Sequence, residues 1–404
     1  MEKKIVKIMK ITAVVCVVIL LIEFIYIGFF MKEKSVYFDG INAVVEVDEG
    51  LLTVGSNNNN EQYFEKAKIT RYNEKKEKIF EKIYNKGYNG VFLNVIEDSY
   101  GNYVAVGSYE ATKEELENSI RTALIVKYDK DGNILYEADF QLLGNSKYTS
   151  IVEVEDGYIV AGQSIYENMV VGVSEDGGAF LVKYNKELEV EWMKSYGNSK
   201  TAVFNDIILH KNYIYAVGMD DLGIGVIAKY DLKGELKKSV KFEDIDNLGF
   251  SGIVYSNNNL FVCSGIIDDD SDDMNADGVI LQYSLDLELE KKEIYEADSS
   301  VRFNQLVVDE IDNVIAIGTS AIIDDMDSDD EVNVFNHDGV IAKYDKNLEK
   351  VMVVSYGDDR DDYLTDIIVY DDSYLITGYS SYEDGSYLSK FITYSYALKT
   401  LGVE

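Results

Sequence analysis

The sequence contains no proline, two cysteines, two histidines and a single tryptophan among its 404 residues. Without proline, tight turns have to be built from Gly, Asn and Asp, which tolerate positive φ angles. Cys16 lies in an apolar N-terminal run and Cys263 in a predicted strand, so no disulfide framework is expected. The 32 tyrosines and the many Val and Ile residues favour an all-β chain.

The scarcity of histidine also limits the chemistry that the chain can perform. His210 and His337 are 127 positions apart, so a His-based metal site or a catalytic triad is not expected. The sequence has no nucleophile elbow, P-loop, dinucleotide fingerprint or zinc signature. The enzyme class that stays open is a carbohydrate-active enzyme of the glycoside hydrolase type, which needs two carboxylates near a central channel.

Basic side chains are few, with 38 Lys and Arg against 73 Asp and Glu and a net charge of -35. Beyond residue 40 the balance is 32 basic against 69 acidic side chains. Such a charge repels the phosphates of nucleic acids, which excludes them as partners. It favours cations or basic proteins, or it serves only to keep the protein soluble.

The one long hydrophobic run, ITAVVCVVILLIEFIYIGFF, spans residues 11–30 and is long enough to cross a bilayer as a helix. It is bulky to its end, with no small-x-small pair, which favours an uncleaved signal anchor over a cleaved signal peptide, and lipidation of Cys16 is disfavoured. Four lysines precede it: Lys3, Lys4, Lys7 and Lys10. The positive-inside rule then predicts a single-pass protein of the cell membrane. Its parts would be a cytoplasmic tail (1–10), a transmembrane helix (11–31), a juxtamembrane linker (32–40) and an extracytoplasmic domain (41–404).

From residue 41 onward the sequence repeats itself. An apolar tetrad ending in glycine recurs every 47 to 60 residues, at Gly55, Gly107, Gly162, Gly218, Gly265, Gly318 and Gly378. Each is followed by an apolar strand that ends in tyrosine, at Tyr72, Tyr128, Tyr184, Tyr230, Tyr283, Tyr344 and Tyr394. With an apolar run before each glycine and an alternating stretch after each tyrosine, every unit has four short strands. The pattern predicts an all-β fold, a seven-bladed β-propeller of four-stranded antiparallel blades preceded by one N-terminal transmembrane helix.

The segment AFLVKYNKELEVEWMKSYGNSKTAVFNDIILHKNYIYAVG (179–218) resembles the bacterial SBBP-type seven-bladed propeller repeat. In that family an Asp-Gly precedes a (V/I)K(Y/L)(D/N) strand, a Trp-containing strand ends in Tyr-Gly, and a DG(Y/W)xVxG strand follows. All seven units resemble it, although the tryptophan is present only at Trp192. The resemblance implies a membrane-anchored, exported propeller and assigns no activity.

Strand order predicts which loops share a face of the ring. The turns between first and second strands and between third and fourth strands leave on one face, and they are two to five residues long. The loops between second and third strands, and the crossovers to the next unit, leave on the other face and are expected to be long and to carry binding residues. An acidic face is predicted there, formed by Asp268, Asp269, Asp270, Asp272, Asp324, Asp325, Asp327, Asp329, Asp330, Asp358 and Asp359.

One of these loops has the opening of a calcium-binding loop. Asp273, Asn275 and Asp277 alternate and are followed by Gly278, which matches the first ligands of an EF-hand. Ser284 occupies position twelve, where an EF-hand has a bidentate Glu. Ca²⁺ is therefore the candidate metal, with low affinity of the extracellular type, and solvated Asp-Gly turns are the alternative.

Together these patterns predict a membrane-anchored propeller that binds or scaffolds an unknown protein or envelope polymer through its acidic face. An axial pocket with two paired acids and aromatics would favour the enzyme. A centre filled by apolar side chains, with acids only at the rim, would favour the binding module. Because every unit is contiguous in sequence, the first is expected to meet the last by packing alone, unless Val36–Phe38 adds a strand there.

Overall fold

The computed structural model describes residues 39–59, 64–111, 121–142, 144–165, 178–197, 201–245, 248–265, 277–295, 300–323, 335–357, 360–381, 387–395 and 400–403. The predicted tail and transmembrane helix, and all of the linker before Asp39, lie outside these residues. Among the residues described, no helix has the length and apolar character needed to cross a bilayer.

The described chain forms seven four-stranded antiparallel sheets, each built from four consecutive strands. The first four sheets contain β1 (Asp39–Val47), β2 (Gly50–Asn59), β3 (Phe64–Asn73), β4 (Lys78–Ile83); β5 (Tyr88–Glu97), β6 (Tyr103–Glu110), β7 (Arg121–Tyr128), β8 (Ile134–Phe140); β9 (Asn145–Val154), β10 (Gly157–Ile165), β11 (Gly178–Asn185), β12 (Val190–Ser195); and β13 (Val203–His210), β14 (Tyr213–Met219), β15 (Gly225–Asp231), β16 (Leu236–Phe242). The last three contain β17 (Phe250–Ser256), β18 (Asn259–Gly265), β19 (Gly278–Ser284), β20 (Leu289–Tyr295); β21 (Ser300–Val308), β22 (Val314–Ile323), β23 (Phe335–Tyr344), β24 (Lys350–Tyr356); and β25 (Asp362–Tyr370), β26 (Ser373–Ser381), β27 (Tyr387–Ser395), β28 (Thr400–Val403).

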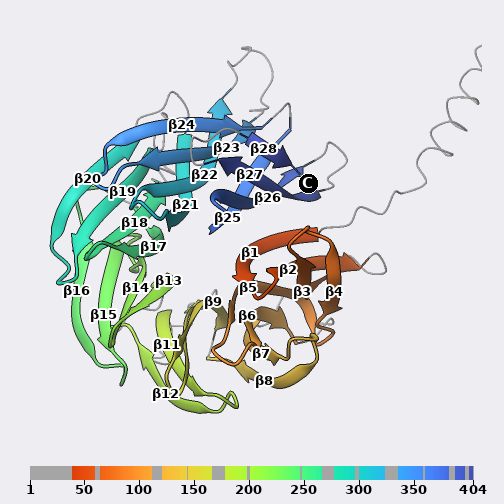
Figure 1. Cartoon of the computed structure of the whole chain (residues 1–404). Helices are drawn as coiled ribbons and strands as arrows, with labels where there is room; N and C mark the ends of the chain where they lie inside the picture. Colours follow the sequence, from red (N-terminus) through yellow and green to blue (C-terminus); the bar gives the residue numbers. More distant parts are fainter. Residues whose placement is uncertain are drawn as a thin grey trace, which may run out of the picture. The chain divides into compact units, whose positions relative to one another are not determined.

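The seven sheets are the blades of a closed propeller. Their first strands, β1, β5, β9, β13, β17, β21 and β25, each contact the next, and β25 contacts β1 (Figure 1). The predicted all-β, seven-bladed fold is thus confirmed. Blade one (β1–β4) and blade seven (β25–β28) pair no strands with each other, so within the described residues the ring closes by packing, as predicted. Val36–Phe38 lies outside the described part.

The hydrophobic core lies between blades. One cluster joins Val54 and Ile69 of blade one to Phe92 and Leu124 of blade two, and similar clusters join the later pairs. Both surfaces of a blade are therefore covered, and the middle strands are buried along their whole length, as in β6 and β7. This is why the middle strands are continuous apolar runs, whereas β8 and β16, on the outer edge of their blades, contain charged as well as apolar residues.

The recurring glycine has a geometric cause. In every blade the first strand has a β-bulge opposite the second strand, and in all blades but the fifth the residue before this bulge pairs with the recurring glycine. The bulge pushes a backbone carbonyl into the place of a side chain, so that a Cβ on Gly318 would lie 1.9 Å from the carbonyl oxygen of Arg302. In blade five the register puts Ser264 at this position, and not the predicted Gly265.

We expect Gly318→Ala to lower the free energy of unfolding by about 1–3 kcal/mol, because the backbone of β21 has to move away from the new methyl group. Gly40→Ala is the matched control, since its Cβ would meet only Oγ of Ser56 at 3.4 Å. Urea unfolding followed through the fluorescence of Trp192 measures both. Equal stability of the two variants would contradict this account of the repeat.

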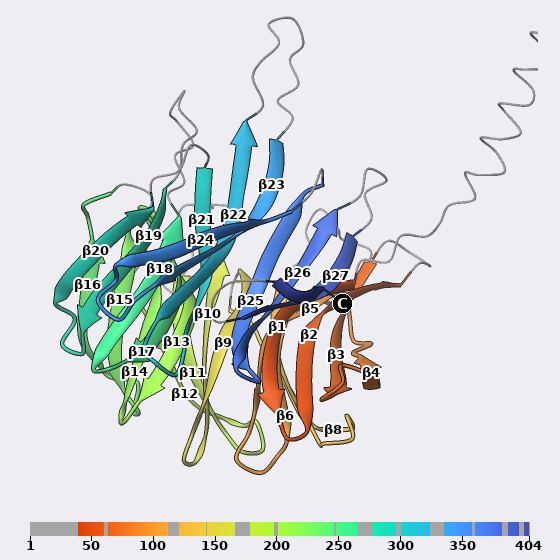
Figure 2. The same cartoon turned by 45° about the horizontal axis from the view of Figure 1, so that its top comes forward.

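The strands run between two faces of the ring (Figure 2). On one face, here called the turn face, the connections within each blade are two to five residues long, as predicted. On the other, the loop face, the prediction of long connections holds only in part. The loops between second and third strands have 10 to 12 residues in blades two, three, five and six but four or five in the others, and the crossovers between blades have four to seven.

Candidate functional site at the axis of the ring

The bulges place one residue of each blade at the axis. These seven residues, here called the axial ring, are Asn42, Leu93, Thr149, Asn205, Ser251, Asn304 and Thr365. All of them are half-buried, and six are polar. The innermost strands thus carry amides and hydroxyls at six of their seven bulges, where the binding-module prediction expected apolar side chains.

Four residues of the axial ring, in blades one, three, four and six, connect their blade to the next by hydrogen bonds. Asn42 Nδ2 donates to the carbonyl oxygen of Phe92 at 2.9 Å. The same bond recurs from Thr149 to the Phe204 carbonyl at 2.7 Å and from Asn205 to the Phe250 carbonyl at 2.7 Å. In blade six, Asn304 Nδ2 is 3.3 Å from the carbonyl oxygen of Leu364. These polar side chains satisfy backbone groups that the bulges leave unpaired.

Two carboxylates follow the axial ring by one residue, Asp206 in β13 and Asp366 in β25. Asp206 accepts hydrogen bonds from Ser150 Oγ (2.7 Å) in blade three, from the amide of Ile253 (3.1 Å) in blade five and from that of Ile207 (2.8 Å). Asp366 accepts the amides of Val44 (2.8 Å) and Ile367 (2.9 Å). The bond from Val44 crosses from blade one to blade seven, so Asp366 helps to close the ring.

Both carboxylates are half-buried and bonded to neighbouring blades. Desolvation raises the pKa of Asp206 to about 6 and that of Asp366 to about 7, although their hydrogen bonds lower it, and the charge of Asp206 adds to the rise at Asp366. This resembles the paired acids that the enzyme alternative needs. However, both oxygens of each carboxylate already accept hydrogen bonds within the ring, which is the environment of a structural acceptor.

His337 lies on the loop face at the end of blade six. Its Nδ1 is 3.2 Å from Oδ1 of Asp361, and its backbone amide donates to the same oxygen at 3.0 Å. Its ring stacks on Tyr363 of blade seven, with centroids 5.3 Å apart, and Tyr363 stacks on Tyr379 at 5.0 Å. His337 therefore belongs to an inter-blade contact and not to a pair of metal ligands.

His210 ends β13 on the turn face and its ring packs against Tyr255 of the next blade, with ring centroids 3.9 Å apart. Burial lowers its pKa, with a further contribution from Lys211. The two histidines thus lie at opposite ends of the strands, and no catalytic site joins them.

The predicted acidic face and calcium loop fall almost entirely outside the described residues. This applies to all eleven aspartates of the acidic face and to Asp273 and Asn275; Asp277 is described, just before β19. Within the described ranges no group of three or more His, Cys, Asp or Glu side chains could hold a metal ion. Three described acids at this face are paired with cations: Asp362 with Lys390 (3.5 Å), Glu110 with Arg121 (3.2 Å) and Asp220 with Lys241.

Two buried triads near the turn face were missed by the sequence analysis. In the first, Lys127 Nζ lies 3.0 Å from Oδ2 of Asp98, which also accepts the hydroxyl of Tyr158 from the next blade at 2.6 Å. Burial alone would raise the pKa of Asp98, but the bonds from Tyr158, Asn102 and Lys127 lower it to about 2. The available signal was the lysine that precedes the recurring tyrosine.

The second triad repeats this arrangement between blades six and seven. Lys343 Nζ lies 3.3 Å from Oδ2 of Asp309, and the hydroxyl of Tyr374 donates to the same oxygen at 2.7 Å. Lys343 also donates to that hydroxyl at 2.8 Å. The recurrence of the whole set in two blade pairs shows that it fastens neighbouring blades.

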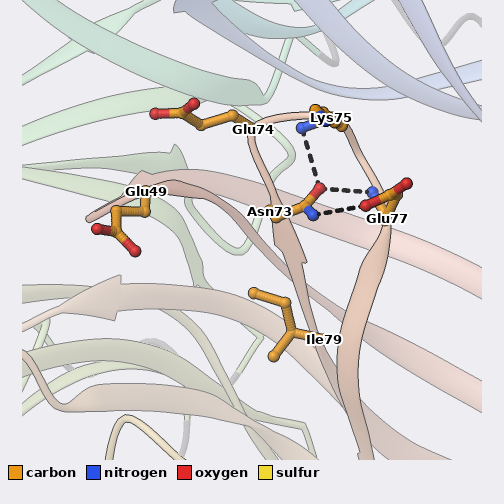
Figure 3. A pocket seen from close by; sticks show the side chains of 6 residues that line it. All are labelled: Glu49, Asn73, Glu74, Lys75, Glu77 and Ile79. Carbon is orange, nitrogen blue, oxygen red and sulfur yellow. Dashed lines mark hydrogen bonds between the residues drawn. The ribbon is translucent and has the colours of Figure 1, made fainter.

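A shallow pocket of about 300 Å³ lies on the turn face of blade one (Figure 3). Its centre is Asn73, whose Oδ1 accepts the amides of Lys75 and Glu77 at 2.9 Å. The same turn, with one side chain holding the amides two and four residues later, recurs at Asp129, Asn185, Asp231, Ser284 and Asp345. The pocket is therefore a by-product of a turn that stabilises six blades.

No protein-family model matches the chain, and no curated protein is significantly similar to it. Among solved structures, it is similar to the WD40 β-propeller domain of Doa1, at 12% identity and a TM-score of 0.49, over 88% of this chain and 96% of that one. It is also similar to the β-propeller domain of the Trilobed protease from Pyrococcus furiosus, which has an open velcro topology, at 11% identity and a TM-score of 0.49, over 91% and 96%. At these identities no site residue is carried over from either structure.

Proposed function

We propose that this protein is a binding or scaffold module, held at the outer surface of the cell membrane by an N-terminal signal-anchor helix. The observation that carries the proposal is that the two acids next to the axial ring, Asp206 and Asp366, are engaged in hydrogen bonds to neighbouring blades. Asp206 and Asp366 are the only carboxylates among the described residues one position beyond the axial ring, and both hold neighbouring blades together. Because these polar groups already bond neighbouring blades, the ring acts as a rigid support. Binding is therefore assigned to its loops.

The loop face is the binding surface in this proposal. The long connections of blades two, three, five and six leave from it, and the aspartates of blades five and six belong to these connections. A basic protein or an envelope polymer bridged by cations suits this charge. A Ca²⁺ ion held by Asp273, Asn275 and Asp277 would assist such bridging.

A carbohydrate-active enzyme is the second candidate, favoured by the raised pKa values of Asp206 and Asp366 and by the effect of the Asp206 charge on Asp366. Glycoside hydrolysis needs one carboxylate to donate a proton and the other to act as nucleophile or base, each aimed at the substrate. Here the oxygens are aimed at backbone amides, and no aromatic residue occurs in the axial ring. If Asp206→Asn and Asp366→Asn abolish hydrolysis of a glycan by folded protein, the enzyme replaces the binding module.

The proposed location has a direct test. The full chain is fused at Glu404 to alkaline phosphatase, which is active only outside the bacterial cytoplasm, or to a fluorescent protein that folds only inside it. We expect phosphatase activity in the membrane fraction and no fluorescence. Replacing Lys3, Lys4, Lys7 and Lys10 by glutamate is the control and should reduce export of the ring. Fluorescence with an inactive phosphatase would refute the extracytoplasmic location.

A further inference from the structure

The outer edge of blade six differs from the outer edges of the other blades. The fourth strand of a blade is paired on one side only, which leaves a row of backbone N–H and C=O groups open to another strand. Charged residues and short length are ordinary means of keeping such an edge unpaired. β4, β8, β12, β16 and β20 each contain two or more charged residues, and β28 is four residues long. β24 has the sequence KVMVVSY, whose one charge is at its first residue.

β24 is accessible along its outer side. Within the described part of the chain it is the last strand of its sheet and pairs only with β23 (Figure 1). Val351 is 55% exposed and Met352 is 41% exposed. The ammonium group of Lys350 lies 5.2 Å from the ring centroid of Tyr295 in blade five, at the start of the strand. The remainder of β24 is therefore an uncharged edge with apolar side chains in contact with solvent.

The rest of the molecule holds β24 in its extended conformation. Val353 packs against the core between blades five and six, and Val354 and Tyr356 pack against the core between blades six and seven. Lys390 of blade seven also donates a hydrogen bond to the hydroxyl of Tyr356 at 3.3 Å. A strand fixed in this way loses little conformational entropy when a second strand pairs with it.

The sequence of β24 is complementary to itself. Two copies of the strand can pair antiparallel about a two-fold axis at Val353. Lys350 of each copy then lies opposite the uncharged Tyr356 of the other, so no like charges meet. A two-fold interface needs such a surface, because the same patch has to fit on both sides. The other opposite pairs are Val351 with Ser355 and Met352 with Val354.

The same pairing is unfavourable at the other edges. In β8 it puts Glu137 of two copies opposite each other, and in β16 it puts Lys237 opposite Lys241. The central residue of β20 is again a lysine. β4 and β12 would have to bury charges that already act within their own blades, such as Glu191, which lies 2.9 Å from Lys183. Self-complementarity without a charge penalty is thus a property of β24.

We infer that β24 is a docking edge for a second copy of this chain, so that two rings associate through their sixth blades in one continuous sheet. The paired surface is narrow, which is typical of weak and reversible interfaces. The two copies also repel each other through a net charge of -35 each. Salt screens this repulsion and leaves the apolar contact intact, so the dimer should be strengthened by salt, whereas an interface of ion pairs is weakened by it.

The dimer is independent of the proposed binding role and goes beyond it. The phosphatase fusion does not involve β24, so either proposal can fail without the other.

Sedimentation velocity of the purified full chain in a mild detergent, at rising protein concentration and at low and high salt, tests the pairing. We expect a monomer–dimer equilibrium that high salt shifts toward the dimer. Val351→Lys and Ser355→Glu should each weaken the dimer by about tenfold or more, because each puts a charge into a dry contact. Both substitutions in one chain should restore association, since the new lysine of each copy then faces the new glutamate of the other.

Leu289→Lys is the matched control, because Leu289 lies on the outer edge of the neighbouring blade and is 44% exposed. It should change the dissociation constant of the dimer by less than about twofold. A chain that stays monomeric at every concentration and salt level would overturn the docking edge. So would a dimer that persists in Val351→Lys, an equal loss in Leu289→Lys, or a double variant that does not regain association.

Discussion

Replacing Lys343 by methionine is expected to lower the free energy of unfolding by about 3–5 kcal/mol, the largest effect of any substitution considered for this protein. Lys343 is buried between blades six and seven, 3.3 Å from the carboxylate of Asp309 and 2.8 Å from the hydroxyl of Tyr374. Methionine fills similar space but leaves Asp309 charged, buried and short of its counter-ion. Replacing one member of the Lys343–Asp309 pair is therefore expected to lower the free energy of unfolding more than replacing both members.

Urea unfolding of the purified full chain measures this, with Trp192 of blade three as the reporter of the whole ring. The control is Lys346→Met, an exposed lysine three residues away, which should change stability by about 0.5 kcal/mol or less. In the double variant Lys343→Met/Asp309→Asn, the loss should be smaller than the sum of the single losses by about 1 kcal/mol or more. Simple additivity, or a loss below about 1 kcal/mol for Lys343→Met, would show that the triad does not fasten the blades.

The second large effect is a dependence of stability on pH that comes from Asp366 and Asp206. Their folded-state pKa values, about 7 and about 6, lie above the ordinary value of 3.8. Between pH 4 and 7 the folded protein therefore binds more protons than the unfolded chain, and stability falls as pH rises through this window. For Asp366 we expect a loss on the order of 2–3 kcal/mol between pH 5 and pH 8.

Asp366→Asn isolates this contribution. The side chain faces Val44 of β1, Thr377 of β26 and the rest of β25, and the charged group that acts on it is Asp206. The variant loses one backbone hydrogen bond and should be less stable at pH 5, but its melting temperature should change much less between pH 5 and pH 8. Asp131→Asn, an exposed residue of a turn, serves as control and should keep the slope of the original protein. An unchanged slope in Asp366→Asn would remove Asp366 as the titrating group.

Both predictions concern joints between blades, which differ around the ring. The joint between blades seven and one has a small apolar cluster of Ile41, Val44, Leu51, Leu375 and Phe391. Its polar bonds include those from Val44 to Asp366 and from Lys76 Nζ to Thr393 Oγ1 at 3.1 Å. Thr393 stands where blades two and six have Lys127 and Lys343, so this joint has no buried triad. The contribution of Asp366 therefore falls at a joint with a small apolar cluster and no buried triad.

Much of the fold was predictable because the same sequence pattern recurs in all seven blades. Seven glycine markers and seven tyrosine markers predicted blade number, strand number and contiguous blades, and the structure has all three. The one marker placed a residue off, Gly265, shows the limit of a pattern: in blade five the bulge faces Ser264. The prediction that the connections on the loop face are long holds for four blades and fails elsewhere, since a repeat of strands does not constrain the connections between them.

The sequence by itself determined the repeat, the turns without proline and the excess of acid, because each is a property of neighbouring residues or of the total count. Only the tertiary structure decided which polar residues meet. Asp98 and Tyr158 are 60 positions apart and Asp366 and Val44 are 322 apart, yet each pair shares one hydrogen bond. Closing the ring brings such residues together at the axis and between blades. There, burial and the partners of a carboxylate or lysine decide its contribution to the free energy of unfolding, and composition does not reveal either.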